Sequence, residues 1–360
     1  MRRRNSGFSI LELIIALAIV MLVLATATTF FIGTVRQYKI QTKIVETNIE
    51  GILGLELLRQ DLESLGFGLP WENVTTSAGE ATTILNSADR TTLKASDATN
   101  LRAMVSLNHP TTGTVNNSDY LVIRSTRVGM GSAAGKWTTL QPGGGTRIWD
   151  STSTEEDLGL NDRVIVLSPT LNNRTLVTPG TGILFSAVAG YAPADNLTVT
   201  NIVYGVDNTS LRFPWNRADY YIDNALPTVV PQRCAPNTGV LVKRVVSHTT
   251  GDLMTPLPLL DCAADMQIVY GLDADADPNT PLGWLDDISD RTADVIRTQL
   301  KEVRVHILAQ EGQRDDSYRT PLDNIPVGLP GLGSNFGVGE YRNYRWKVYT
   351  IVVKPRNLAN

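Results

Sequence analysis

The longest apolar run of the chain follows a short polar leader. Leu13 to Ile32 comprises 20 residues without a charge, a proline or a glycine. At 1.5 Å per residue, a helix of that length spans about 30 Å, the thickness of the hydrocarbon core of a bilayer. Arg2, Arg3 and Arg4 precede the run, and a positive segment before an apolar stretch is typical of an export or membrane signal. The pattern predicts a membrane-spanning helix.

From Arg36 onward, apolar residues recur every three or four positions among polar ones. This spacing predicts that the helix continues and carries one broad apolar stripe. The stripe would comprise Val45, Ile49, Ile52, Leu55, Leu58, Leu62 and Leu65. Gly66 and Pro70 supply a C-cap glycine and a helix breaker, so the helix is expected to end near Leu65. A coiled coil is the alternative, but the apolar period drifts from strict heptads.

The rest of the chain predicts short strands. Residues 72 to about 118 are rich in Thr, Ser, Asn, Ala and Asp, which favours irregular surface structure. Beyond them, runs dominated by Val, Ile, Tyr and Thr lie between turn residues. These runs are Tyr120–Ser125, Arg163–Leu167, Asn196–Tyr204, Tyr220–Asp223, Gly239–Val246, Met266–Tyr270, Val303–Leu308 and Trp346–Val353. A helical turn is expected near Ser289–Leu300.

The expected fold class is therefore α+β, with one long helix packed on a mostly antiparallel β domain. Residues 8–33 would form the membrane-spanning part of the helix, and residues 34–66 its amphipathic half. The β domain would cover residues 72–360, with a subdivision near residue 236 as an option. A helix from Phe8 to Leu65 would be about 90 Å long.

Composition describes a chain that can bury a core, with 42% hydrophobic and 19% charged residues. The net charge of −4 gives no basic surface of the kind that binds nucleic acid, so no nucleic-acid partner is expected. The only cysteines, Cys234 and Cys262, both follow the apolar run. In an exported chain such a pair favours one disulfide over two free thiols.

Catalytic and metal-binding patterns are weak. Gly131–Lys136 resembles a phosphate loop, but its spacing is one residue short and Trp137 replaces the Ser or Thr that would hold magnesium. His109, His248 and His306 show no metal-ligand spacing. The sequence therefore predicts no enzyme.

Alternating acids that could supply oxygen ligands to calcium occur at Asp273, Asp275 and Asp277. An EF-hand would need a glycine where Pro278 stands and a bidentate glutamate where Trp284 stands. Another geometry, using Asp286 or Asp287, stays open. Calcium is the only cofactor that the sequence suggests, and a solvated acidic turn is the simpler interpretation.

Where the leader meets the apolar run, the sequence is Gly7-Phe8-Ser9-Ile10-Leu11-Glu12-Leu13. This segment resembles the cleavage motif of type IV prepilins and pseudopilins. The resemblance implies that prepilin peptidase removes residues 1–7 by cutting between Gly7 and Phe8, and that Phe8 becomes N-methylated. It also implies that Glu12, the fifth mature residue, neutralises the Phe8 amine of a neighbouring subunit. A lone acid in a membrane segment is costly and is therefore a functional candidate.

Two other N-terminal processing schemes compete with this one. A secretory signal peptide would be cut after Ala25-Thr26-Ala27 and would leave Glu12 without a role. An uncleaved signal anchor would place Glu12 near the membrane edge.

Three later segments resemble the PilW family of minor pilins, and the length of the chain agrees with that family. The segments are Arg217–Ile222, Met266–Asp273 and the last strand, which ends at Asn357. A cysteine pair near the C-terminus, found in many pilins, is absent. The resemblance implies a minor pilin held by a single span in the bacterial inner membrane, with its C-terminal domain in the periplasm, and later in a surface pilus that serves adhesion and twitching motility.

The implied partners are prepilin peptidase, the inner-membrane assembly platform, the major pilin and other minor pilins, with a tip adhesin as an option. A type II secretion pseudopilin and a membrane-anchored periplasmic enzyme are the competing hypotheses.

Overall fold

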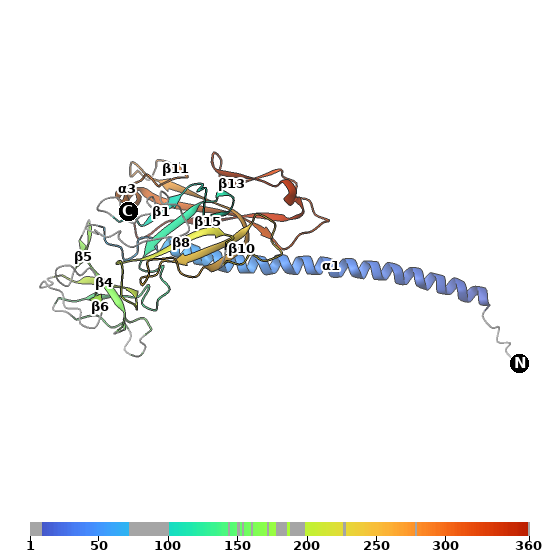
Figure 1. Ribbon diagram of the computed structural model, residues 1–360, viewed down its shortest axis with the longest axis horizontal. Helices are drawn as coiled ribbons and strands as arrows, with labels where there is room; N and C mark the ends of the chain where they lie inside the picture. The colour runs from blue at the N-terminus through green and yellow to red at the C-terminus, as the bar shows by residue number, and fades with distance from the viewer. Residues whose placement is uncertain are drawn as a thin grey trace.

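One long helix projects from a β-rich body, and its N-terminal half extends away from that body (Figure 1). The computed structural model describes residues 9–71, 101–142, 145–149, 152, 155–159, 161–170, 173–177, 186–187, 199–225, 228–277 and 279–358. Every strand pair within these residues is antiparallel. The predicted α+β class, a long N-terminal helix on a mostly antiparallel β domain, is confirmed.

The helix α1 (Ile10–Glu63) is 54 residues long and continuous. Ser9 caps its N-terminus, and at its C-terminus the backbone N–H of Ser64 donates to the carbonyl of Gln60 at 3.0 Å. Gly66 then adopts φ +74°, which favours glycine and turns the chain away from the helix axis. The end predicted near Leu65 is confirmed within two residues.

The strands within the described residues form two sheets and a hairpin. The larger sheet runs in the order β1 (Met104–Leu107), β2 (Tyr120–Ser125), β8 (Asn216–Asp223), β9 (Gly239–Val245), β10 (Leu257–Leu272), β12 (Leu300–Glu311), β15 (Arg345–Val353), and β11 (Gly283–Leu285) also pairs with β10. The smaller sheet runs β3 (Trp137–Leu140), β7 (Asn201–Asp207), β4 (Arg163–Thr170), β5 (Asn173–Val177), and β6 (Ser186–Ala187) also pairs with β4. The hairpin is β13 (Asn324–Leu329) and β14 (Leu332–Gly337). Short helices are η1 (Val115–Asn117), α3 (Ala293–Gln299) and η2 (Gly339–Asn343).

Each of the eight strand predictions overlaps a strand, and the helix expected near Ser289–Leu300 is α3. The irregular structure predicted to residue 118 is wrong at β1, whose four residues are all buried. A four-residue strand is too short to show an alternating pattern, which is why the sequence did not reveal it. The optional subdivision near residue 236 would separate β8 from β9, yet these strands pair directly in one sheet.

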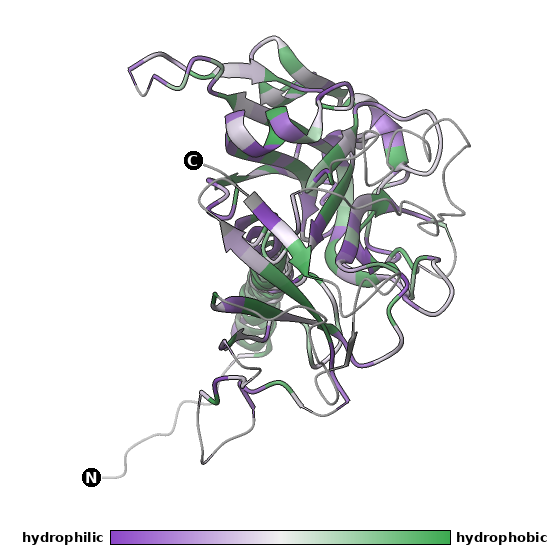
Figure 2. Ribbon diagram, turned by 90° about the vertical axis from the view of Figure 1, so that its left-hand side faces the viewer, coloured by the Kyte–Doolittle hydropathy of each residue, from purple (hydrophilic) through white to green (hydrophobic). Residues whose placement is uncertain are grey.

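The C-terminal half of α1 packs on β10, β12 and β15, and Figure 2 shows it nearly end-on against the sheet. Leu58, Leu62 and Leu65 are fully buried there. The helix lies very close to the β10 backbone at Gly54, where a Cβ atom would collide with the carbonyl oxygen of Leu259. Only glycine permits this approach, so Gly54 sets the distance between helix and sheet.

The predicted apolar stripe divides into two faces. Leu55, Leu58, Leu62 and Leu65 are buried, but Val45, Ile49 and Ile52 are 55%, 56% and 63% exposed. The single stripe was therefore wrong. From Ile49 to Leu58 the apolar residues are three positions apart in three successive steps. Because three residues fall about 60° short of a full helical turn, each step rotates the stripe by about 60° around the helix. These steps together carry it from the solvent side to the sheet side.

Charged side chains also join α1 to the sheet. The Lys243 ammonium of β9 lies 2.5 Å from a carboxylate oxygen of Asp61, and the Tyr220 hydroxyl of β8 donates to the same oxygen. Burial raises the pKa of the Asp61 carboxyl and outweighs the opposing effect of Lys243. The pair is thus partly desolvated and fixes the rotation of α1 on the sheet.

The opposite face of the larger sheet carries the hairpin. Ile325 and Val327 of β13 pack on Ala264 of β10 and Leu308 of β12. Because side chains alternate along a strand, β12 sends Val303, Val305 and Ile307 to the helix side and Leu308 to the hairpin side. The sheet is therefore covered on both faces in this region.

Candidate functional site

The candidate site is the N-terminal end of α1, where the sequence predicts processing and subunit assembly. Gly7 and Phe8, the predicted cleavage residues, lie outside the described residues. Ser9 and Glu12 lie within them. The geometry of Glu12 is therefore the part of the predicted site that the structure describes.

Glu12 forms a capping box with Ser9. The backbone N–H of Glu12 donates to the Ser9 hydroxyl at 3.2 Å, and the backbone N–H of Ser9 donates to Oε2 of Glu12 at 3.0 Å. Both bonds satisfy backbone donors that the first turn of a helix leaves unpaired, and the carboxylate faces the positive end of the helix dipole. Glu12 therefore has a local structural role, which the sequence analysis missed although the Ser-x-x-Glu spacing signals it.

The apolar run of α1 is exposed along its whole length. Among the described residues, α1 is the one helix long and apolar enough to cross a membrane, and none of its most apolar window is buried within the chain. Ile14, Leu22 and Phe31 are each more than half exposed. Such a surface is stable in lipid or against other apolar helices, and it is unfavourable in water.

Polar groups within the run are satisfied by the helix itself. The hydroxyls of Thr28 and Thr29 donate to the carbonyls of Leu24 and Thr26, both at 2.8 Å. Internal pairing of this kind is what a segment in lipid requires, because the hydrocarbon core offers no water as a partner.

Cys234 and Cys262 form a disulfide in the structure, with their Cα atoms 5.0 Å apart. Cys262 belongs to β10, and Cys234 lies in the turn that leads to β9. Beside the bond, Arg233 pairs with Asp261 at 2.7 Å. The side-chain carbonyl of Gln310 accepts from the backbone N–H of Ala235 at 2.6 Å. The disulfide thus ties the turn before β9 to the neighbouring strands.

The alternating acids lie on an exposed loop after β10. Hydrogen bonds from the backbone N–H groups of Asp277 and Asn279 hold the pKa values of the Asp275 and Asp277 carboxyls below their usual range. Asp273 and Asp277 share a hollow with the cations Lys301, Lys354 and Arg356. Over the described part of the chain, no three His, Cys, Asp or Glu side chains are placed to hold a metal ion.

Calcium binding at these acids stays a prediction, and calorimetric titration of the full chain tests it. Heat released with micromolar calcium, and absent after Asp275→Asn and Asp277→Asn, would support the site. No heat with millimolar calcium would remove it.

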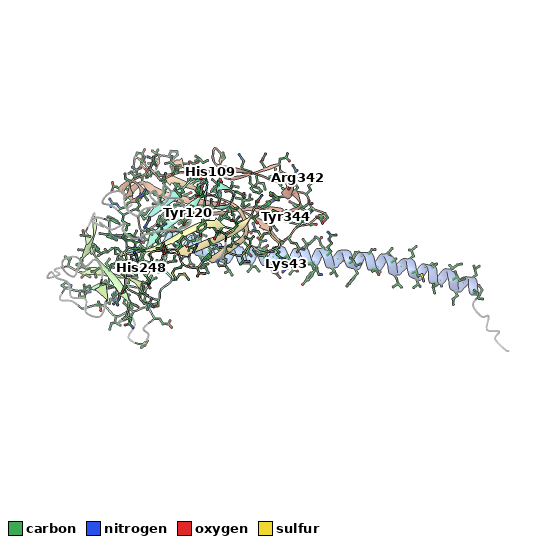
Figure 3. The ribbon with its side chains drawn as sticks, viewed as in Figure 1. Lys43, His109, Tyr120, His248, Arg342 and Tyr344 are labelled. Atoms are coloured by element: carbon green, nitrogen blue, oxygen red, sulfur yellow. A yellow bond between two sulfur atoms is a disulfide. The ribbon has the colours of Figure 1, made fainter. Side chains whose placement is uncertain are left out.

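The histidines serve separate local structures, and Figure 3 shows His109 and His248 in different parts of the body. His248 is buried, and its Nδ1 accepts from the backbone N–H of Arg212 at 3.3 Å, which leaves the proton on Nε2 for the Asn216 carbonyl at 3.0 Å. Desolvation lowers the pKa of His248 to about 4, so the ring is neutral. His306 instead contacts the Thr350 hydroxyl of β15 at 3.1 Å.

Comparison with known proteins places one family motif on the chain. The prokaryotic N-terminal methylation motif matches residues 2–28, which cover the leader and most of the apolar run. Neither the curated proteins nor the solved structures contain a match. The motif, the exposed apolar helix and the antiparallel β body together support a type IV pilin or pseudopilin subunit, a structural protein rather than an enzyme, with α1 as its membrane anchor.

Proposed function

We propose that this protein is a minor type IV pilin of the PilW type, which takes part in starting or capping a filament. The observation that carries the proposal is the methylation motif at residues 2–28, which overlaps the first part of a continuous 54-residue helix. An ordinary signal peptide needs no such continuation. A filament subunit does, because the exposed half of the helix packs in the filament core while the other half carries the globular body.

Subunit packing is the chemistry that the proposal requires. When a subunit leaves the membrane, the apolar side chains between Ile10 and Ile32 must be covered by the helices of other subunits. Val45, Ile49, Ile52 and Leu53 extend this exposed apolar surface beyond the membrane span, on the side of α1 away from its own sheet. They form a second contact surface for neighbouring subunits, and exposed apolar patches of this kind mark interaction sites.

Glu12 supplies the polar element of this packing. The capping box uses Oε2, so Oε1 of the carboxylate can accept from the Phe8 amine of an adjacent chain. In an apolar filament core that pair would neutralise two charges that are otherwise costly to bury.

The position of the smaller sheet supports a place at the filament tip. β4, β5 and β6 lie at the end of the body opposite to the free N-terminal part of α1 (Figure 1). In a stack of subunits with parallel helices, this end of each body faces the subunit ahead. A sheet that projects there fits best on a subunit with nothing ahead of it.

N-terminal mass spectrometry of the mature protein tests the processing. The expected chain begins with N-methylated Phe8. A chain that begins at Thr28 would show signal-peptide cleavage and contradict the proposal, and a chain that retains Met1 would show an uncleaved anchor.

Two substitutions separate the roles of Glu12. Glu12→Gln keeps a capping-box side chain but removes the charge, whereas Glu12→Ala removes both. If the charge matters, both variants are cleaved and inserted normally but fail to enter filaments. If only the cap matters, Glu12→Gln assembles normally. Gly7→Val is the processing control and should leave the chain uncut.

A type II secretion pseudopilin would use the same motif and the same packing. Deletion of the gene distinguishes the two, since loss of surface pili with normal protein secretion supports the pilin, and the reverse result supports the pseudopilin.

A further inference from the structure

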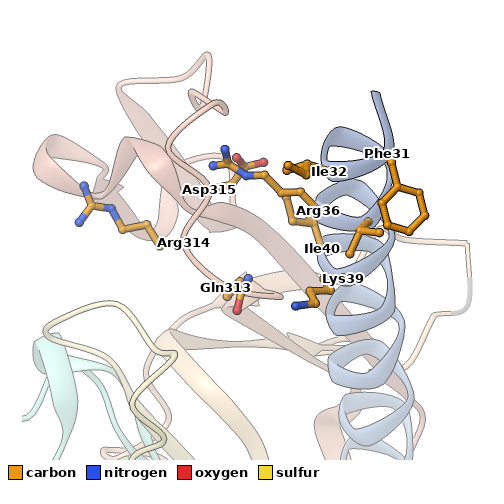
Figure 4. Close-up of a pocket in the computed structure, with 9 residues that line it drawn as sticks. Phe31, Ile32, Arg36, Lys39, Ile40, Gln313, Arg314 and Asp315 are labelled. Carbon is orange, nitrogen blue, oxygen red and sulfur yellow. The ribbon is translucent and has the colours of Figure 1, made fainter. Parts of the chain in front are cut away.

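A hollow of about 360 Å³ lies where α1 leaves its apolar run, between the helix and the loop that follows β12. Figure 4 shows it from the side, with the helix forming one wall and the loop residues Gln313 to Asp315 the other. We call it the interfacial pocket and define it by Ile32, Val35, Arg36, Lys39, Ile40 and Gln313. Its N-terminal side is apolar, and its C-terminal side carries the cations Arg36 and Lys39. A third cation, Arg314 on the loop wall, is already paired with Asp316 at 3.0 Å.

The pocket lies at the level of the lipid headgroups when α1 spans a membrane. The run from Leu13 to Ile32 fills the hydrocarbon core. Arg36 and Lys39 follow the end of the run by about 6 and 10 Å along the helix axis. The headgroup layer on each side is roughly 5–8 Å thick, so the Cα of Arg36 falls within it and that of Lys39 lies a few ångströms beyond it, where the long side chain can reach back to the layer.

Aromatic side chains mark the same level. Phe30 and Phe31 are 78% and 67% exposed at the end of the run, and Tyr38 is 70% exposed beyond it. Aromatic residues gather at membrane surfaces, with tyrosine placing its ring among apolar chains and its hydroxyl in the polar layer. The positions of these aromatic residues thus agree with the depth of the pocket in the membrane that follows from the length of the apolar run.

The two cations have no carboxylate partner. In the part of the chain that the structure describes, no ion pair is formed by Arg36 or Lys39, and both residues are exposed. Asp315, the acid that lines the hollow, is buried and is already bound by Arg345 at 2.7 Å and by the Ser317 hydroxyl at 2.5 Å. The positive charges of Arg36 and Lys39 are therefore available to an anion from outside the chain.

The loop wall is fixed in place before any ligand binds. The backbone N–H of Gly312 donates to the Thr47 hydroxyl of α1 at 3.1 Å, and the N–H of Asp315 donates to the carbonyl of Asn343 at 2.9 Å. Gly312 has φ +69°, and a Cβ atom there would lie 2.9 Å from a side-chain carbon of Ile44. The loop is thus held against the helix, and binding would not have to order it.

We propose that the interfacial pocket binds the phosphate group of an anionic phospholipid from the periplasmic leaflet. Arg36 donates to the phosphate oxygens as a planar fork and Lys39 adds a point charge. The start of the acyl chain lies along Ile32 and Val35, on the apolar side of the pocket. The lipid seats the globular body on the membrane before the subunit is extracted. The inference rests on the membrane anchoring in the proposed function.

Native mass spectrometry of the full chain in a non-ionic detergent tests the proposal. The probes are phosphatidylglycerol, phosphatidylcholine and inorganic phosphate, each titrated separately and in competition. The test variant is Arg36→Gln with Lys39→Gln. The matched control is Lys43→Gln, one turn further along α1, where the ammonium pairs with Glu46 at 2.6 Å outside the pocket. Because Arg36 and Lys39 are exposed, circular dichroism should show unchanged folding in every variant.

The expected result is one phosphatidylglycerol per wild-type chain, weaker binding of phosphatidylcholine, and about thirtyfold weaker phosphatidylglycerol binding in the double variant only. Equal binding of both lipids would overturn the proposal, as would equal losses in the double variant and the Lys43 control. Displacement by inorganic phosphate at matched concentration would show a general anion site, and a chain dimer in place of bound lipid would show a subunit contact. Either of these results also overturns it.

The lipid site and the pilin assignment can fail separately in these tests. If Phe8 processing or filament entry fails while the lipid count stands, only the pilin assignment is lost. If incorporation is normal and no lipid is retained, only the lipid site is lost.

Discussion

Removal of the Asp61 carboxylate should loosen α1 from its sheet. In the folded chain, Asp61 and Lys243 are only 13% and 11% exposed, and the Tyr220 hydroxyl donates to the same carboxylate. Asp61→Ala leaves the Lys243 ammonium largely desolvated without a counter-charge. It also leaves a buried hydroxyl without its acceptor.

The expected loss in free energy of unfolding is about 3–5 kcal/mol, the range for a buried ion pair that loses one partner. The matched control is Glu46→Ala, which breaks the pair with Lys43 on the same helix. Both of those side chains are 50% exposed, so the loss there should be about 0–1 kcal/mol. The double variant Asp61→Ala, Lys243→Ala should recover about 1–3 kcal/mol relative to additivity, because the stranded charge is gone.

Urea unfolding of the full chain in detergent micelles measures these differences, with tryptophan fluorescence as the signal. Trp215 is fully buried in the main core and reports its loss. If Asp61→Ala lowers the free energy of unfolding by no more than Glu46→Ala does, the Asp61–Lys243 pair is as weak as a surface pair. The reasoning would then be refuted, and the attachment of α1 to the sheet would not depend on this pair.

Three further predictions concern stability. Gly54→Ala should destabilise the chain by about 1–3 kcal/mol because the new Cβ meets the β10 backbone; Gly33→Ala, with nothing within 4 Å, is the control in the same urea assay. Burial lowers the pKa of His248 from 6.5 to about 4, so stability that is present above pH 6.5 should fall by about 3 kcal/mol as the pH drops toward 4. Thermal unfolding against pH should show a flatter slope in His248→Gln, and an unchanged slope would contradict the assignment. Replacing Cys234 and Cys262 by serine should cost about 3 kcal/mol by opening a loop of 28 residues, measurable as the unfolding difference between oxidised wild type and variant.

The candidate site was only partly predictable. The junction at Glu12 was found from the sequence because a lone acid in an apolar run departs from the composition around it. The capping box was missed, although Ser9 stands three residues earlier, because Glu12 was considered only as a membrane charge. The interfacial pocket was beyond prediction. It joins Arg36 of the helix to Gln313, and no local pattern connects two segments so far apart in the chain.

The sequence itself determined the long helix, its membrane-spanning length and its end near Gly66. It also determined eight of the fifteen strands in the described residues. These features depend on local properties, namely apolar periodicity, run length and turn residues, which act within a few residues. Tertiary structure decided which side of α1 is buried, because that choice depends on where β10 lies and on the close approach at Gly54. It also decided that β1 is a strand, and that Val45, Ile49 and Ile52 remain exposed. Those outcomes depend on contacts between distant segments, and only the folded arrangement of the sheet brings such segments together.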